Sequence, residues 1–181
     1  MRNSTDPLPK ICRMQKTPES LDLACFPVPL IEGNRSFLWI ALWMLISALI
    51  FRPSLPILPY RAKAALLSLF GASIGNNLVV KPSVHIKYPW FLEIGDNVWI
   101  GEDVWFDNPG KIKIGSNVCI SQGAYLVTGN HNLKKSTFDF FSGPIEVADR
   151  CWICAKAIIP PGSKIEPGTV VPIGSVWHMH P

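Results

Sequence analysis

The chain has 181 residues, a length that suits one domain of ordinary size with an appendage rather than two complete domains. Hydrophobic residues make up 48% of it and charged residues 17%, which excludes disorder for most of the chain. Its 17 prolines and 13 glycines disfavour a bundle of long helices. The net charge of +4 arises in residues 1–70, because the remainder carries nine basic and nine acidic residues.

The uneven charge indicates a class of partner. The excess of basic residues lies beside the most apolar stretch of the chain, which favours contact with an anionic membrane surface. No basic stripe interleaved with aromatic residues follows, so we expect no nucleic-acid partner. The odd number of cysteines, five, without a cleavable N-terminal signal sequence, indicates a reducing compartment. We therefore expect a cytoplasmic protein, with peripheral contact at the inner membrane face as an option.

The first elements in chain order are an arm and two helices. Residues 1–36 are rich in proline and polar residues without periodicity, which predicts a loosely ordered arm. Residues 37–51 carry no charge and would form a helix about 22 Å long, shorter than the roughly 30 Å hydrocarbon core of a bilayer. Residues 61–70 contain good helix formers and end at Gly71, a plausible helix stop. Residues 37–73 thus form an apolar and basic helical segment.

Three interpretations of residues 37–51 remain open. The helix can pack on the rest of the protein, lie in the membrane interface, or cross the membrane. A full crossing requires the helix to continue through the prolines at positions 53, 56 and 59, which a helix resists. Trp39 and Trp43 favour the interfacial interpretation, because tryptophan concentrates at membrane–water interfaces.

From Ile74 onward, large apolar residues recur every six positions, apart from two-residue slips at Glu93 and Lys113 that a corner of a coil can absorb, and one longer gap. They are Ile74, Val80, Ile86 and Leu92, then Ile94, Ile100, Phe106 and Ile112, then Ile114, Ile120 and Leu126, then Val147, Ile153, Ile159, Ile165, Val171 and Trp177. In an α-helix of 3.6 residues per turn, side chains spaced six residues apart would point to different sides of the helix. The same spacing suits short strands joined by tight turns. Three such strands make a triangular coil, and coils stack at roughly 4.8 Å. We predict an all-β fold, a parallel β-helix over residues 74–177 with a short tail at 178–181.

One interruption breaks the period. The spacing from Leu126 to Val147 is 21 residues, so about residues 132–146 are predicted to leave the coil as a loop. Long loops on repeat scaffolds often carry function or subunit contacts. Phe138, Phe140 and Phe141 cluster in this loop, and an exposed cluster of that kind needs a partner.

Metal chemistry has little support in the sequence. Cys151 and Cys154 have the spacing of a zinc or redox pair, but no second pair exists and both occupy repeat positions that accept small residues. We interpret them as structural thiols and expect no metal. The chain also has no phosphate-binding loop and no nucleophilic triad.

The repeats and several short strings resemble the hexapeptide-repeat O-acetyltransferases, and in particular the colanic acid biosynthesis acetyltransferase subgroup. The strings are Leu66 to Ala72, Tyr88-Pro89-Trp90, Ile120-Ser121-Gln122, Thr128-Gly129-Asn130-His131 and Cys151-Trp152-Ile153. The resemblance covers about residues 60–176. It implies coils that wind left-handedly, a homotrimer, and acetyl-CoA bound in a cleft between two chains. It also implies acetyl transfer to a saccharide, free or lipid-linked, during polysaccharide assembly.

The resemblance assigns two site residues. His131 matches the family's general base, and its chemistry agrees, because a neutral imidazole can take the proton of a sugar hydroxyl as the oxygen attacks a thioester. Ala155 matches a position that contacts acetyl-CoA. Close relatives often have an aspartate after the histidine, whereas this chain has Asn132, so Asp139 is the candidate carboxylate for orienting the ring.

A second function class stays open at this point. The family pattern continues with an Asn-Pro-Ala segment and a basic tail that grips the CoA phosphates, and this chain has neither. The alternative to an acetyltransferase is therefore a catalytically impaired β-helix that acts as a binding or scaffold protein. Binding or hydrolysis of acetyl-CoA distinguishes the two.

Overall fold

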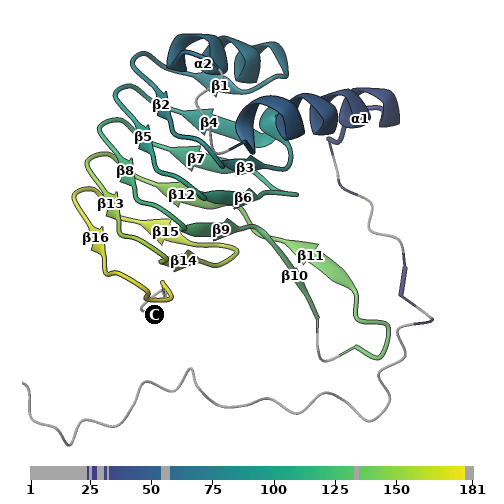
Figure 1. The fold of residues 1–181 in the computed structure, drawn as a ribbon. Helices are drawn as coiled ribbons and strands as arrows, with labels where there is room; N and C mark the ends of the chain where they lie inside the picture. Colours follow the sequence, from purple (N-terminus) through teal and green to yellow (C-terminus); the bar gives the residue numbers. More distant parts are fainter. Residues whose placement is uncertain are drawn as a thin grey trace, which may run out of the picture.

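The computed structural model describes residues 24, 26–27, 31, 33–53, 58–132 and 135–177. Two helical segments precede a stack of short parallel strands, from which one hairpin projects (Figure 1). The predicted parallel β-helix is confirmed. Most of the predicted arm at 1–36, and all of the tail at 178–181, lie outside the described residues.

The coils are built from three parallel sheets, each contributing one strand to a coil. The first sheet contains β1 (Ser73–Ile74), β4 (Leu92–Ile94), β7 (Ile112–Ile114), β12 (Ile145–Val147) and β15 (Lys164–Ile165). The second sheet contains β2 (Val79–Val80), β5 (Trp99–Ile100), β8 (Cys119–Ile120), β13 (Trp152–Ile153) and β16 (Val170–Val171). The third sheet contains β3 (His85–Ile86), β6 (Trp105–Asp107), β9 (Tyr125–Val127) and β14 (Ile158–Ile159).

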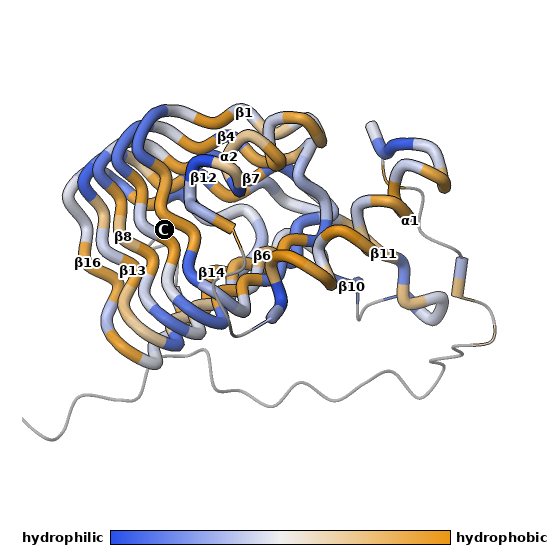
Figure 2. The backbone as a smooth tube through the Cα atoms, turned by 45° about the horizontal axis from the view of Figure 1, so that its top comes forward, coloured by the Kyte–Doolittle hydropathy of each residue, from blue (hydrophilic) through white to orange (hydrophobic). Residues whose placement is uncertain are grey.

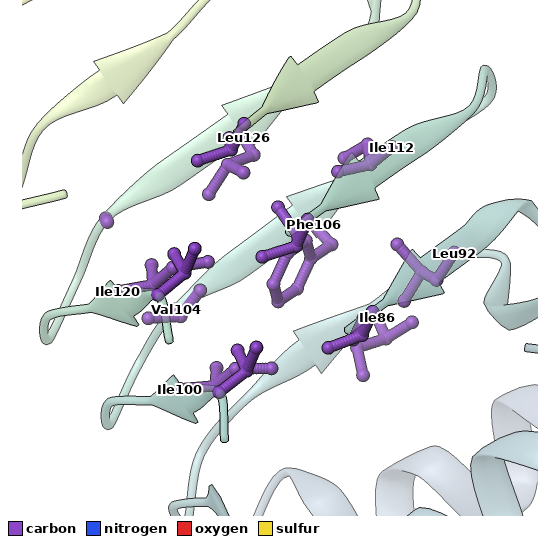
Figure 3. Packing of buried hydrophobic residues seen from close by; sticks show 14 of the residues in the cluster. Ile86, Leu92, Ile100, Val104, Phe106, Ile112, Ile120 and Leu126 are labelled. Atoms are coloured by element: carbon purple, nitrogen blue, oxygen red, sulfur yellow. The ribbon is translucent and has the colours of Figure 1, made fainter. Parts of the chain in front are cut away.

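The six-residue series forms the interior of this stack. Equivalent residues pair in register from coil to coil, as Ile74 does with Ile94 and Ile94 with Ile114. Nearly all residues of the series are buried, and their side chains pack together in the interior enclosed by the three sheets (Figure 3). Each strand is only two or three residues long, so burial of this column, rather than any single strand, stabilises the fold.

Polar residues turn the chain at the edge between the first and second sheets, which is hydrophilic in Figure 2. Asn77, Asn97 and Asn117 occupy equivalent places in three coils, with φ of 57°, 56° and 58°. Asparagine tolerates this left-handed conformation better than most residues. The amide of Asn77 also donates to Asn97 at 2.9 Å, and Asn97 donates to Asn117 at 3.3 Å, which links the coils along this edge.

The helices cover the first coil. They are α1 (Phe37–Ile46), the π-helical segment η3 (Ser47–Phe51) and α2 (Tyr60–Leu69), and the chain leaves α2 through Gly71 at φ 95°. A first coil has no coil before it, so some of its carbonyls need other donors. Trp43 Nε1 donates to the carbonyl of Ile86 at 2.9 Å, and Lys63 Nζ donates to that of Val80 at 3.1 Å. Burial lowers the pKa of Lys63.

The helix predicted at 37–51 packs on the protein along one face only. Trp43, Ser47 and Phe51 are buried, whereas Phe37 and Leu38 are 81% and 78% exposed. Leu42, Met44, Leu45 and Leu49 are also exposed, so the outer face of α1 is apolar. Within the described residues, no helix has the length and hydropathy needed to cross a membrane.

The excursion from the coil is a hairpin, and its bounds differ from the predicted 132–146. It is formed by β10 (Gly129–His131) and β11 (Phe140–Ser142), which pair antiparallel. Ile145–Val147 is already strand β12, paired with Ile112–Ile114 of β7. Strands of the first sheet can bury both outer residues of a three-residue strand, as Ile112 and Ile114 do. A strict count of six therefore placed the return to the coil two residues late.

Candidate active site

The string Thr128-Gly129-Asn130-His131 forms the root of the hairpin, and each residue has a structural role. The buried hydroxyl of Thr128 accepts a hydrogen bond from the backbone of Gly110 at 2.8 Å, and its carbonyl accepts one from Gly143 at 2.9 Å. At Gly129, a Cβ atom would lie 2.9 Å from the ring of Phe140. The side chain of Asn130 accepts from the backbone N–H of His131 at 2.8 Å. The motif thus anchors the strand that carries His131.

Three aromatic rings contact the imidazole of the partly buried His131. It stacks on Phe138 with centroids 4.3 Å apart and an interplanar angle of 3°, and meets Phe140 edge-on at 5.6 Å. Phe26 approaches at 5.3 Å. These three rings pack against the imidazole, whereas Phe141, which we expected with them, is 47% exposed.

A backbone carbonyl selects the tautomer that the neutral form of this ring adopts. Nδ1 of His131 lies 2.9 Å from the carbonyl oxygen of Phe138. A carbonyl only accepts, so this hydrogen bond requires the proton on Nδ1 and leaves Nε2 of a neutral ring as the basic atom. Phe138 adopts φ 52°, a conformation uncommon for a bulky residue, in the turn that places its carbonyl.

Asp139 does not orient the ring. Its carboxylate accepts hydrogen bonds from Lys135 and Thr137, within the hairpin tip. These bonds hold the pKa of Asp139 below its ordinary value. Asn132 donates its backbone N–H to the carbonyl of Asp139 at 2.8 Å. The partner of His131 was missed in the sequence because a backbone carbonyl leaves no side-chain signature.

A cavity of about 400 Å³ opens beside His131. Its walls are Phe26, Ile31, Lys87, Tyr88, Pro109, His131 and Phe140. The wall at Tyr88 is held by the buried side chain of Asn108, which accepts from the Tyr88 N–H at 3.0 Å and donates to its carbonyl at 2.7 Å. A buried amide that binds both the N–H and the carbonyl of one residue holds that part of the wall in place. The cavity therefore gives a preformed space next to the base.

The structure does not bring Ala155 to His131 within one chain. Ala155 lies in the turn from β13 to β14, at the edge between the second and third sheets, where its carbonyl accepts from the N–H of Gly174 at 2.9 Å. The hairpin with His131 leaves from the far end of the third sheet, after β9, and points away from the stack (Figure 1). A site that uses both residues needs a second copy of the chain.

The cysteines and histidines do not assemble a metal centre in the described part of the chain. Cys151 is buried in the repeat interior, and its thiol donates to the carbonyl of Glu166 at 3.1 Å. Cys154 follows in the next turn and is partly buried. Both behave as the small structural residues that the repeat pattern predicts.

Comparison with known proteins gives the relatives of this chain. It is 42% identical over 150 residues to a protein of Escherichia coli (strain K12) provisionally named as the colanic acid biosynthesis acetyltransferase WcaF. The match covers 83% of this chain and 82% of the relative. The chain belongs to the hexapeptide-repeat acetyltransferase family. A WcaF protein of Shigella flexneri matches with the same identity and coverage, and no protein-family model matches the sequence.

Three solved structures that are less than 25% identical to this chain share its fold. A hexapeptide-repeat acetyltransferase from Vibrio cholerae superposes with a TM-score of 0.69 at 23% identity, over 81% of this chain and 84% of that chain. The same protein in complex with acetyl-CoA gives 0.69 at 22% identity, over 78% and 76%. A maltose O-acetyltransferase from Clostridium difficile 630 gives 0.62 at 24% identity, over 78% of both chains. These similarities support the architecture, while the site rests on this chain's own geometry.

Proposed function

We propose that this protein is an O-acetyltransferase that moves an acetyl group from acetyl-CoA to a sugar hydroxyl in the biosynthesis of a cell-surface polysaccharide. The observation that carries this proposal is the hydrogen bond between His131 Nδ1 and the Phe138 carbonyl, which leaves Nε2 free to act as a base. Family membership supplies the acetyl transfer, and the relative named for colanic acid biosynthesis supports a saccharide acceptor.

The proposed reaction needs one base and no covalent enzyme intermediate. Nε2 of His131 takes the proton of the acceptor hydroxyl as its oxygen attacks the thioester carbonyl. The tetrahedral intermediate then expels the CoA thiolate, which receives the proton back from the imidazolium. The Phe138 carbonyl accepts a hydrogen bond from Nδ1 throughout and stabilises the charged ring. Removing this base is expected to cost about 10²–10⁴-fold in rate.

We also propose that the site forms between neighbouring chains of a homotrimer, at the hairpin of one chain and the Ala155 edge of the next. His131 and Ala155 lie at opposite ends of the third sheet within one chain, and this assembly would bring His131 of one chain next to Ala155 of another. The half-exposed Phe141 on the hairpin provides an apolar contact for the neighbour. Mixing inactive His131→Ala protein with an Ala155→Trp variant, whose added ring would obstruct acetyl-CoA, tests it. Shared sites regain activity on subunit exchange, and separate sites do not.

Peripheral membrane contact on the cytoplasmic side completes the proposal. The exposed apolar face of α1 and the basic excess of the first third together suit an anionic bilayer surface. Flotation with vesicles rich in anionic lipid tests this contact. Leu38→Glu and Leu45→Glu are expected to lower vesicle binding about tenfold, because each places a charge on the apolar face. Ile173→Glu, on a 73% exposed residue of the last coil, is the matched control.

The experiment that tests the proposed activity uses the full-length chain. Purified protein is incubated with radiolabelled acetyl-CoA and de-O-acetylated colanic acid, and acetyl incorporation is measured beside acetyl-CoA binding by calorimetry. Transfer by the wild type and its loss in His131→Ala support the proposal. A protein that binds no acetyl-CoA and transfers no acetyl group contradicts it and favours a scaffold role.

A further inference from the structure

A row of aromatic rings runs along the outer face of the third sheet. His85, Trp105 and Tyr125 occupy the same place in three successive coils, as the pairing of β3, β6 and β9 shows. Their ring centroids are 5.5 Å and 5.3 Å apart. We call these three residues the aromatic row. They recur every 20 residues, but they lie outside the six-residue series that fills the interior.

The aromatic row is open to solvent at its centre. Trp105 is 48% exposed, and the packing partners the structure gives its ring are the two neighbours in the row. Cross-strand aromatic pairs stabilise a sheet, which explains part of this arrangement. Stabilisation of the sheet alone does not require the indole of Trp105 to leave about half of its surface in water, since Phe106, the next residue, is completely buried.

Fixed polar groups lie directly beside the aromatic row. Asp107 accepts a hydrogen bond from Lys87 Nζ at 2.9 Å and another from the Tyr125 hydroxyl at 3.0 Å. Burial, followed by the nearby Asp107 carboxylate, raises the pKa of Tyr125 to about 12, so its hydroxyl remains a donor. An ammonium group, a carboxylate and a phenol held in one cluster can donate to and accept from several hydroxyl groups.

The polar cluster joins the aromatic row to the candidate active site. Lys87 follows β3 by one residue and points outward like His85, since alternate residues of an extended strand share a face. The same lysine forms part of the cavity wall at His131. A continuous surface therefore leads from Trp105 past Asp107 and Lys87 to the base.

We propose that this surface binds a saccharide chain, with the aromatic row as a stacking platform for sugar rings upstream or downstream of the acetylated residue. The C–H groups on one face of a pyranose ring are weakly positive and apolar, and they complement the negative face of an aromatic ring. Hydroxyl groups at the ring's edge reach the polar cluster. The acceptor is then an oligosaccharide or polymer rather than a free monosaccharide, an inference that rests on the proposed function.

One arrangement of the proposed trimer leaves this surface free, and we place the trimer in that arrangement. With the edge between the first and second sheets at the threefold axis, the hairpin of one chain adjoins the Ala155 edge of the next. The third sheet then faces outward. The aromatic row also begins on the coil that the helices cover, since Trp43 of α1 bonds to Ile86 of β3.

Three substitutions at Trp105 test the platform in the full-length protein. Trp105→Ala removes the ring, Trp105→Leu keeps apolar surface without a π face, and Trp105→Phe keeps a smaller ring. The probes are de-O-acetylated colanic acid and the monosaccharides released from it by acid. We expect the Ala and Leu variants to raise KM for the polymer about tenfold, with KM for monosaccharides and for acetyl-CoA unchanged. The Phe variant should stay within about threefold of wild type.

Direct binding separates this inference from the proposed function. Calorimetric titration of each variant with the polymer, without acetyl-CoA, needs no catalysis. Wild-type binding that weakens in the Ala and Leu variants supports the platform, even if no acetyl transfer is detected and the proposed function fails. Equal polymer affinity in all four proteins overturns it, as does a wild type that binds no polymer. A change of sedimentation in Trp105→Ala also overturns it, because the row would then be a subunit interface.

Discussion

The coils and the hairpin solve different structural problems with different kinds of residue. In the coils, one aliphatic place is repeated many times, and Ile100, Ile120 and Ile153 are interchangeable members of one column of the second sheet. In the hairpin, each contact to His131 occurs once, through a stacked ring, an edge-on ring and one carbonyl. Redundancy in the coils provides stability, whereas the hairpin provides a position for one reactive atom.

This difference predicts how the two regions respond to substitution. Loss of a buried coil residue leaves a cavity whose cost is measured in unfolding free energy. Loss of a hairpin contact moves or removes a catalytic atom at little cost to the stack, because the hairpin packs outside the buried column (Figure 1). Stability and turnover should therefore separate cleanly between the regions.

His131→Ala gives the largest expected effect on turnover. We expect kcat to fall about 10²–10⁴-fold, since the substitution removes the only candidate base on the hairpin strand. Thermal stability and acetyl-CoA affinity should remain nearly unchanged, because His131 is only partly buried and lies outside the aliphatic columns. Steady-state kinetics, calorimetry and thermal unfolding measure the three quantities. A variant that keeps more than about a tenth of wild-type turnover rules out His131 as the base.

Phe106→Ala should show the converse behaviour. Phe106 is fully buried inside the second coil, and truncation of a buried phenylalanine costs roughly 3–5 kcal/mol of unfolding free energy. We expect a matching shift in the denaturation midpoint, while kcat per folded molecule stays within about twofold of wild type, with the folded fraction taken from the calorimetric stoichiometry of acetyl-CoA binding at low temperature. A kcat loss as large as that of His131→Ala would show that the coil and the hairpin are not independent.

A pair of glycine substitutions sharpens the contrast. In Gly129→Ala the new Cβ meets Phe140 and Pro109 at 2.9 Å, so the hairpin must shift and kcat should fall about tenfold. In Gly168→Ala nothing lies within 4 Å, but φ is 74°, so strain should cost about 1 kcal/mol of stability without loss of kcat. Steady-state kinetics and thermal unfolding of both variants measure whether kcat falls only in Gly129→Ala and whether Gly168→Ala loses stability without losing kcat. Equal kcat losses in the two would contradict it.

The sequence predicts the coils well and the hairpin poorly for a physical reason. Aliphatic periodicity reports burial, and burial repeats, so the register of residues 74–126 follows from counting. The C-terminal end of the hairpin was misplaced because the series was resumed at Val147, although Ile145 and Val147 are both buried in one strand, as Ile112 and Ile114 are. The carbonyl of Phe138 depends on a positive φ at a phenylalanine, and no residue pattern announces that conformation.

The aromatic row shows a signal that becomes visible only after the coils are aligned. His85, Trp105 and Tyr125 share no motif, and their spacing of 20 has meaning only once that number is the length of a coil. For Ala155 the position within the repeat could be predicted from the sequence. Its distance from His131 could not, because that distance depends on which edge of the coil each residue occupies.

The smallest expected effect concerns Asp139, and it decides what orients the base. The pKa of Asp139 is lowered by hydrogen bonds from Lys135 and Thr137, so the folded hairpin favours the carboxylate. A lowered folded-state pKa means that this contribution to hairpin order is present above the unfolded pKa of about 3.9 and is lost as pH falls through the folded value. Asp139→Asn should abolish this acid-side dependence, measured by hydrogen exchange of hairpin amides.

At neutral pH the same substitution should change kcat by less than about threefold, because an exposed ion pair contributes little and the orienting atom is the backbone oxygen of Phe138. Thr137→Val, which removes one donor to the carboxylate, serves as the control and should behave like Asp139→Asn. If Asp139→Asn instead lowered kcat by 10²-fold or more, the range expected for loss of the base, the carboxylate would have to reach the imidazole during turnover. The hairpin would then rearrange when substrate binds, and the ring orientation seen here would belong to the resting protein alone.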